Sequence, residues 1–281
     1  MEIGINMTIS SQSMDVTKIA EKAESLGFES MWLPEHPVMP VNPVSKYPGS
    51  PDGAIPDYMS DMADPYLGLA MASAVTSKLK LGTGISLIPE RNPLVLAKEI
   101  ATLDHFSRGR FILGIGTGWL REETEIMGGD FDHRWSQTRE AILAMKELWT
   151  KEEAEFHGKF IDFPPVKCFP KPAQKPHPPV LLGGFARNVF KRVVAWGDGW
   201  MPTGVTPEQV KMGRATLDEL ADAAGRDPRS IQITVFGQPS DAGVIRGFEE
   251  AGADRVIVRL PNTRDEGALT ELERMAGQVL R

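Results

Sequence analysis

The chain between residues 16 and 33 reads VTKIAEKAESLGFESMWL and holds one complete helix-and-strand repeat. Four apolar residues in its first part recur at helical spacing and share one face: Ile19, Ala20, Ala23 and Leu26. This pattern predicts an amphipathic helix over residues 16–26. The short run at 29–33 ends in Met31-Trp32-Leu33, which favours a buried strand.

Short runs of this kind alternate with helical stretches along most of the chain. We predict eight strands, at residues 2–6, 29–33, 80–87, 110–115, 180–182, 199–201, 232–236 and 255–260. Further helices are predicted at 134–150 and after Thr206, which precedes Pro207 as a cap precedes proline at a helix start. Eight parallel strands joined by helices favour a closed barrel. The predicted fold class is α/β, a TIM (β/α)8 barrel that occupies residues 1–281 as a single domain.

Two stretches interrupt the alternation. Residues 37–64, after the second strand, contain six prolines and are too long for a plain connection, so they predict a lid or binding loop, with a disordered insert as the alternative. Residues 152–179, between the fourth and fifth strands, contain a hairpin pattern at 156–160 and a proline-rich return. We expect both insertions to decorate the barrel.

Composition excludes several classes of protein. Lys and Arg number 31 and Asp and Glu 38, which gives a net charge of −7, a poor match for nucleic acid or an anionic membrane surface. The longest stretch without a charged residue, 65–77, has 13 residues and is too short for the roughly 20 that cross a bilayer. The first residues lack the pattern of a secretory signal, so we expect a cytoplasmic protein without membrane or nucleic-acid partners.

The sequence predicts no metal site. Cys168 is the only cysteine, which excludes an internal disulfide and a cysteine-based zinc site. The histidines other than His36 are not spaced as metal ligands: His105, His133, His157 and His177.

Residues that follow the strands are the first candidates for chemistry, because barrel enzymes place their active sites at the carboxyl ends of the strands. Glu35 and His36 follow the second strand. A histidine beside a carboxylate at this place could act as a base or bond to a ring heteroatom, and an ordinary surface histidine is the alternative. No catalytic triad and no pair of catalytic carboxylates is evident.

Glycines also follow several strands. The run at 114–119 contains Gly116, Thr117 and Gly118 but does not match the dinucleotide-binding pattern. Its glycines would allow backbone to approach a flat ligand, and a tight structural turn is the alternative. Gly82 and Gly84 in the third strand indicate a bulge beneath a ligand.

The fifth strand leads into a predicted phosphate site. Gly183, Gly184, Phe185 and Arg187 lie just before a helix predicted at 188–196. Amides at a helix start bind phosphate, and Arg187 adds a positive charge. A phosphate site together with one histidine favours a bound organic cofactor.

Taken together, these segments resemble the luciferase-like monooxygenase superfamily of flavin and deazaflavin barrels, which includes bacterial luciferase. The segments that carry the resemblance are 27–36 (GFESMWLPEH), 81–85 (LGTGI), 91–93 (RNP), 102–104 (TLD), 109–119 (GRFILGIGTGW), 178–184 (PPVLLGG) and 197–200 (GDGW). The resemblance implies a TIM-type barrel, usually dimeric, with the tricyclic ring of the cofactor over the strand ends.

The resemblance also implies roles for individual residues. It assigns His36 as a base or substrate contact, with Glu35 as the acidic residue before it. It places a non-prolyl cis peptide that supports the central ring at Gly84–Ile85, and it places the phosphate end of the cofactor at Gly183–Gly184. In related sugar-phosphate dehydrogenases a glutamate follows the Gly-Thr-Gly turn, but Trp119 stands here. This departure favours a less polar substrate. We expect Glu122 and Glu123, a turn further on, to be exposed residues of a helix start, and an approach of one of them to the site is the alternative.

The resemblance therefore implies an oxidoreductase that uses coenzyme F420 to transfer a hydride to or from a small organic substrate. His36 would move the proton and Trp119 would shape the substrate pocket. An FMN-dependent monooxygenase, supplied with reduced flavin by a separate reductase, is the alternative. A barrel that binds a cofactor without catalysis is a further one. The sequence leaves open the substrate and the direction of reaction.

Overall fold

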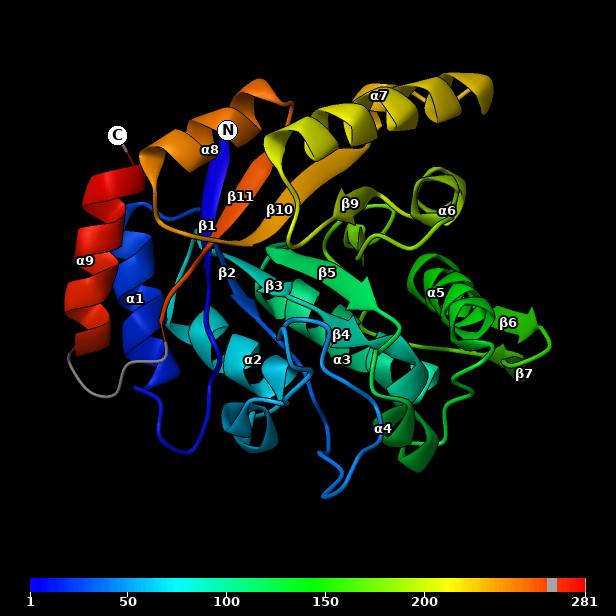
Figure 1. Cartoon of the computed structure of the whole chain (residues 1–281). Helices are drawn as coiled ribbons and strands as arrows, with labels where there is room; N and C mark the ends of the chain where they lie inside the picture. The colour runs from blue at the N-terminus through cyan, green and yellow to red at the C-terminus, as the bar shows by residue number, and fades with distance from the viewer. Residues whose placement is uncertain (262–266, 281) are drawn as a thin grey trace.

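The computed structural model describes residues 1–261 and 267–280. Its main feature is a closed barrel of eight parallel strands, in the order β3-β2-β1-β11-β10-β9-β8-β5, which pairing of β3 with β5 completes (Figure 1). The strands are β1 (Glu2–Asn6), β2 (Ser30–Leu33), β3 (Lys80–Thr83), β5 (Phe111–Gly116), β8 (Val180–Gly183), β9 (Gly199–Met201), β10 (Gln232–Gln238) and β11 (Arg255–Arg259). The predicted TIM barrel is confirmed.

Helices surround the strands (Figure 1). The described helices are α1 (Val16–Leu26), α2 (Pro65–Val75), α3 (Pro93–Phe106), α4 (Arg121–Ile126), α5 (Arg134–Thr150), α6 (Val189–Trp196), α7 (Pro207–Ala223), α8 (Ala242–Glu250) and α9 (Gly267–Val279). Short 3-10 turns are η1 (Asp57–Asp61), η2 (Ile88–Glu90) and η3 (Pro228–Ser230). None of these described helices has both the length and the hydrophobicity of a membrane span.

Local sequence explains where several helices begin. Three of them start with proline, each directly after a residue whose side chain caps the helix. Proline suits the first helical position because it lacks the backbone N–H that would have no acceptor there. The caps are Asp64, Asn92 and Thr206. Thr206 and Gln209 form a reciprocal capping box, which confirms the predicted helix start. The predicted bounds of α1 and α5 are also confirmed.

The third predicted strand is wrong in one respect. Residues 80–87 do not form a continuous strand but divide into β3 and β4 (Ser86–Leu87). The break lies at Gly84–Ile85, where the peptide bond is cis, at the place that the family resemblance implied. Phe236 lies against Gly84, and the side chain of Ile85 packs over Gly116. The break therefore brings Ile85 to the carboxyl end of the barrel.

Both insertions have defined backbone contacts. Residues 37–64 contain η1 and lie at the same end of the barrel as α4 (Figure 1). The backbone N–H groups of Val44 and Ser45 donate to Oε1 of Glu122, at 2.7 and 3.1 Å. In the second insertion, β6 (Ala154–His157) and β7 (Asp162–Val166) form an antiparallel pair, as the hairpin pattern predicted.

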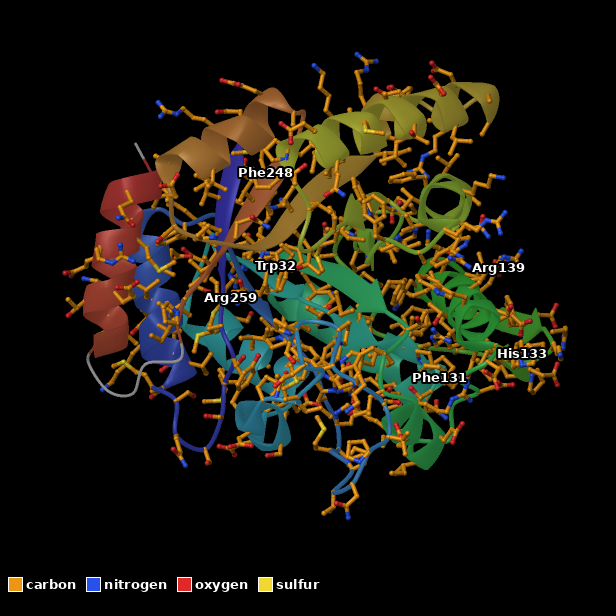
Figure 2. All side chains as sticks on the ribbon, viewed as in Figure 1. Trp32, Phe131, His133, Arg139, Phe248 and Arg259 are labelled. Atoms are coloured by element: carbon orange, nitrogen blue, oxygen red, sulfur yellow. The ribbon has the colours of Figure 1, made fainter. Side chains whose placement is uncertain are left out.

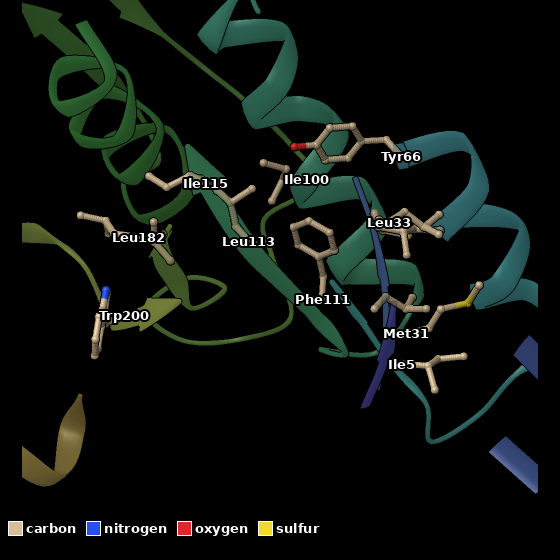
Figure 3. Packing of buried hydrophobic residues seen from close by; sticks show 14 of the residues in the cluster. Ile5, Met31, Leu33, Tyr66, Ile100, Phe111, Leu113, Ile115, Leu182 and Trp200 are labelled. Atoms are coloured by element: carbon tan, nitrogen blue, oxygen red, sulfur yellow. The ribbon is translucent and has the colours of Figure 1, made fainter. Parts of the chain in front are cut away.

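Two apolar clusters stabilise the barrel. The larger one lies between strands and helices, and Figure 3 shows part of it, including Phe111, Leu113 and Trp200. The smaller one fills the barrel interior: Trp32, Ile112, Leu181, Met201 and Ile257, with Ile85 and Phe236 partly buried against it. Burial of a large apolar side chain contributes about 1.5–3 kcal/mol, so the interior is a packed core and not a pore.

Candidate functional site

His36 and Glu123 form a buried pair at the carboxyl end of the barrel. Nδ1 of His36, just after β2, lies 2.7 Å from Oε2 of Glu123, in the first turn of α4. Their side chains are 9% and 1% exposed. The N–H of Val38 donates to the other oxygen of Glu123, at 3.4 Å. The expectation that Glu123 is an exposed helix-start residue is wrong, because the first insertion packs over it.

This pairing orients the imidazole. A carboxylate at Nδ1 fixes a proton on that nitrogen and stabilises the charged ring when Nε2 is also protonated. Nε2 forms no hydrogen bond with any residue that the structure describes. The ring of Trp119 stands nearly perpendicular to that of His36, with centroids 5.8 Å apart, and the ring of Tyr47 also packs against Trp119, with centroids 5.3 Å apart. The free nitrogen is therefore available to a ligand beside an aromatic wall.

Glu35 is held differently from its neighbour His36. It is buried, and one oxygen accepts from Ser86 Oγ at 2.8 Å and from the N–H of Leu87 at 2.7 Å. Its other oxygen accepts from Arg91, which also binds Asp64 at 2.6 Å. Both oxygens of Glu35 are engaged with the protein, so the geometry favours a positioning role for this residue over proton transfer.

A third buried glutamate, Glu90 in η2, completes the cluster. Thr124 Oγ1 donates to its Oε1 at 2.8 Å, and its Oε2 is buried with no hydrogen-bond partner. Burial, followed by the negative charge of Glu123, raises the pKa of Glu90 to about 8. Glu90 is therefore protonated near neutral pH. Glu90 belongs to no recognisable sequence motif, and the sequence predicts an exposed position for Glu123, with an approach to the site as the alternative. No pair of catalytic carboxylates is evident in the sequence, whereas Glu35, Glu90 and Glu123 are all buried at this end of the barrel.

A cavity of about 380 Å³ adjoins this cluster. Its lining includes Glu35, His36, Glu90, Asp64 and Met127. Its size suits a small ligand or one part of a larger one.

The glycines at 114–118 are packed against protein atoms. A Cβ at Gly116 would lie 2.0 Å from Cδ1 of Ile85, so glycine here admits that side chain. Gly118 has φ of +77°, and a Cβ there would lie 3.0 Å from Glu90 Oε1 and Thr124 Oγ1. Thr117 between them is buried. These glycines shape the end of the barrel around Ile85 and Glu90, and their contacts with a cofactor stay a prediction.

The segment after β8 fits the phosphate end of a cofactor. Gly184 has φ of +85° with open space around it, and Phe185 is 55% exposed. Arg187 is exposed and forms no ion pair within the described part of the chain. Helix α6 follows without a side-chain cap at Asn188, which leaves N–H groups at its start for an anion. Gly183, by contrast, is buried against Ile115 and Ile85.

The other candidate residues for metal binding or nucleophilic chemistry do not form a site within the described part of the chain. Among residues 1–261 and 267–280, no three histidine, cysteine, aspartate or glutamate side chains are placed to hold a metal ion. Cys168 is buried. His133 pairs with Asp130 on the surface near α5, far from His36 in the chain (Figure 2).

Comparison with curated proteins gives relatives over the whole chain. An uncharacterized protein of Mycobacterium bovis is 36% identical over 99% of both chains. The FMNH(2)-dependent dimethylsulfone monooxygenase of Pseudomonas putida is 33% identical over 70% of this chain and 52% of its own. The F420-dependent hydroxymycolic acid dehydrogenase of Mycobacterium tuberculosis is 26% identical over 89% of this chain and 65% of its own.

Solved structures share the fold. The monooxygenase RslO1 of Streptomyces bottropensis has a TM-score of 0.80 at 22% identity and covers 100% of this chain and 99% of its own. The coenzyme F420 dependent tetrahydromethanopterin reductase of Methanopyrus kandleri has a TM-score of 0.76 at 18% identity, over 99% and 98%. The family model for luciferase-like monooxygenases matches residues 4–242. The chain therefore belongs to the luciferase-like monooxygenase family.

Proposed function

We propose that this protein is a coenzyme F420-dependent oxidoreductase that transfers a hydride between the deazaflavin and a small organic substrate. The observation that carries the proposal is the buried His36–Glu123 pair, with Nε2 of His36 free. Hydride transfer to or from an alcohol or carbonyl group requires one proton to move at the substrate oxygen. A histidine held by a carboxylate is suited to that task.

The chain's own residues divide the work as follows. Nε2 of His36 takes the proton from a substrate hydroxyl during oxidation, or returns it to a carbonyl oxygen during reduction. Glu123 stabilises the imidazolium that forms in the first case. Trp119 bounds the substrate on one side, and Glu35 holds Arg91 and β4 in place beneath the site.

Two regions would hold the cofactor. Ile85 and the turn at Gly116, Thr117 and Gly118 would support the ring system, and Gly184, Phe185 and Arg187 would hold the phosphate. F420, when bound, supplies the hydride acceptor or donor. The fit rests on the uncapped start of α6 and the unpaired charge of Arg187, both of which suit a phosphate.

A second candidate is an FMN-dependent monooxygenase that receives reduced flavin from a separate reductase. Sequence identity favours it, because the P. putida FMNH(2)-dependent relative is 33% identical and the F420-dependent one is 26% identical. FMN also carries a phosphate, so the segment after β8 does not separate the two candidates.

Binding titrations with F420 and with FMN, each oxidised and reduced, test the proposal. We expect F420 to bind at micromolar concentration or tighter, about −8 kcal/mol, and more tightly than FMN. His36→Ala should abolish F420-dependent turnover and leave F420 binding intact. A preference for reduced FMN, together with oxygen uptake, would replace the first candidate with the second. Binding of neither cofactor would contradict both.

A further inference from the structure

Three residues in register on neighbouring strands, here called a rung, include two polar side chains near the carboxyl end of the barrel. Asn6 on β1 is in register with Trp32 on β2 and with Arg259 on β11. Trp32 belongs to the interior cluster, as does Ile257, two residues before Arg259. Side chains two apart on a strand share a face, so Arg259 extends from the interior face above Ile257. Figure 2 labels Trp32 and Arg259 among the strands near the centre of the molecule.

Arg259 has no charged partner among the residues that the structure describes. It is exposed and forms no hydrogen bond or ion pair with the residues at 1–261 and 267–280. Its guanidinium lies beside Gly237, where a Cβ would stand 3.3 Å from Nη2. Arg255, on the same face, differs, because Glu29 binds it with two hydrogen bonds of 2.7 and 2.8 Å. Within the described residues, the arginine at the amino end of β11 is neutralised by Glu29, and the one at the carboxyl end has no such partner.

The side-chain oxygen of Asn6, which is in register with Arg259, also lacks a hydrogen-bond partner among the described residues. Asn6 is only 8% exposed, and its Oδ1 is buried and forms no hydrogen bond with the described part of the chain. Buried amide groups are almost always bonded, so an unsatisfied one has bonding capacity left for a water molecule or a ligand. Turning the amide about its last bond exchanges Oδ1 for Nδ2, so Asn6 can accept from a ligand or donate to it.

The surroundings define the rest of the ligand. Trp32 and Ile257 are fully buried, and Phe236, partly buried against them, is the apolar side chain that a ligand can contact. The predicted phosphate segment follows β8, which β9 and β10 separate from β11 in the sheet. An anion at Arg259 is therefore distinct from the phosphate at Arg187. A planar apolar body with one oxyanion fits these groups, because a guanidinium binds a carboxylate with paired hydrogen bonds.

We propose that Arg259 and Asn6 bind an anionic oxygen group of the substrate, of the carboxylate type, with the apolar part of the substrate against Phe236. The assignment to the substrate rests on the proposed function, whereas the anion site itself does not. It adds an anionic group to the less polar substrate that Trp119 favours: the substrate would be apolar along Trp119 and anionic at β11.

Benzoate and benzamide test the site, because they differ only in the charged group. We expect calorimetry on the wild-type protein to show benzoate binding at least tenfold tighter than benzamide. Arg259→Met and Asn6→Asp should remove this preference, the second because it places a negative charge beside the guanidinium. Arg259→Lys should retain part of it. Arg229→Met, an exposed arginine on η3, is the matched control and should retain all of it.

Three outcomes would overturn the proposal: equal binding of the two compounds, an unchanged preference in Arg259→Met, or a tenfold loss of F420 or FMN affinity in Arg259→Met without benzoate. The last outcome would show that Arg259 binds the cofactor and not the substrate. Melting temperatures of all variants establish that each is folded. If the wild type binds neither cofactor but keeps its preference for benzoate, the proposed function fails and the anion site stands.

Discussion

His36 and Glu123 are 87 positions apart in the sequence, yet Nδ1 of the histidine lies 2.7 Å from Oε2 of the glutamate. We expect Glu123→Gln to lower kcat by about 100-fold, because the amide cannot stabilise a charged imidazole as the carboxylate does. Binding of F420 should change less than twofold. Steady-state kinetics and a cofactor titration measure the two effects.

The matched control for this prediction is Glu125→Gln on the same helix. Glu125 is exposed and pairs with Arg121 at 3.0 Å. Its replacement should leave kcat within twofold of wild type. An equal loss of kcat in both variants would show that any change in α4 lowers turnover, and that the pairing of Glu123 with His36 is not the cause.

The raised pKa of Glu90 predicts a pH dependence of stability. Burial and the charge of Glu123 raise it to about 8, so folded Glu90 keeps its proton where the unfolded residue, with a pKa of 4.5, has lost it. The folded state binds more protons, and stability falls as pH rises from about 4.5 to 8. Glu90→Gln should remove this fall. In urea unfolding, the free energy of unfolding of Glu90→Gln should differ little from that of the wild type at pH 4.5. At pH 9 it should exceed the wild-type value by an amount on the order of 3–5 kcal/mol. A variant no more stable at pH 9 would contradict the prediction.

At the opposite end of the barrel, Glu29 should have the reverse effect. Burial acts to raise its pKa, but hydrogen bonds and the charge of Arg255, with help from Lys80, lower it to about 2. The resulting stability, about 3 kcal/mol, is present above pH 4.5 and is lost as pH falls toward 2. Glu29→Gln leaves the buried charge of Arg255 without its partner and should cost about 3–5 kcal/mol at pH 7. The difference in free energy of unfolding between Glu29→Gln and wild type should become smaller as pH falls toward 2. A difference that does not change with pH would refute this account.

Arg187 provides a test of the phosphate site. Arg187→Ala should weaken FMN binding about tenfold, which corresponds to about 1.4 kcal/mol, and leave riboflavin binding unchanged, since riboflavin lacks the phosphate. Arg192→Ala is the control: Arg192 lies on α6, the helix that follows Arg187, and stacks on Trp135 at 4.1 Å. Equal weakening of both ligands by Arg187→Ala would place the phosphate elsewhere.

Exposed apolar residues on α2 and α3 indicate where two copies could meet. Leu67 is 70% exposed and Phe106 is 74% exposed. Apolar exposure on neighbouring helices is typical of an interface, and we propose a homodimer through this face. Leu67→Glu should convert the dimer to a monomer in light scattering, whereas Met212→Glu on α7, at a position 70% exposed, should not. A wild-type protein that is monomeric at micromolar concentration would end this proposal.

Much of the architecture could be predicted from the sequence. Apolar periodicity set the bounds of α1 and α5, and a threonine before proline marked the start of α7. These features depend on neighbours within one or two turns, so local composition is sufficient to determine them. The position of His36 at a strand end followed from the same alternation.

The partners of these residues required the tertiary structure. Glu123 resembled any acidic residue at a helix start until the insertion at 37–64 covered it, and Glu90 acquired its raised pKa from burial and from Glu123. Arg255 and Arg259 are the same residue type on one strand, and only the packing of Glu29 against the first distinguishes them. The sequence by itself determined the repeating elements, because hydrophobic periodicity is local. Closure of the barrel decided which charges are buried, paired or free, because burial depends on residues distant in the chain.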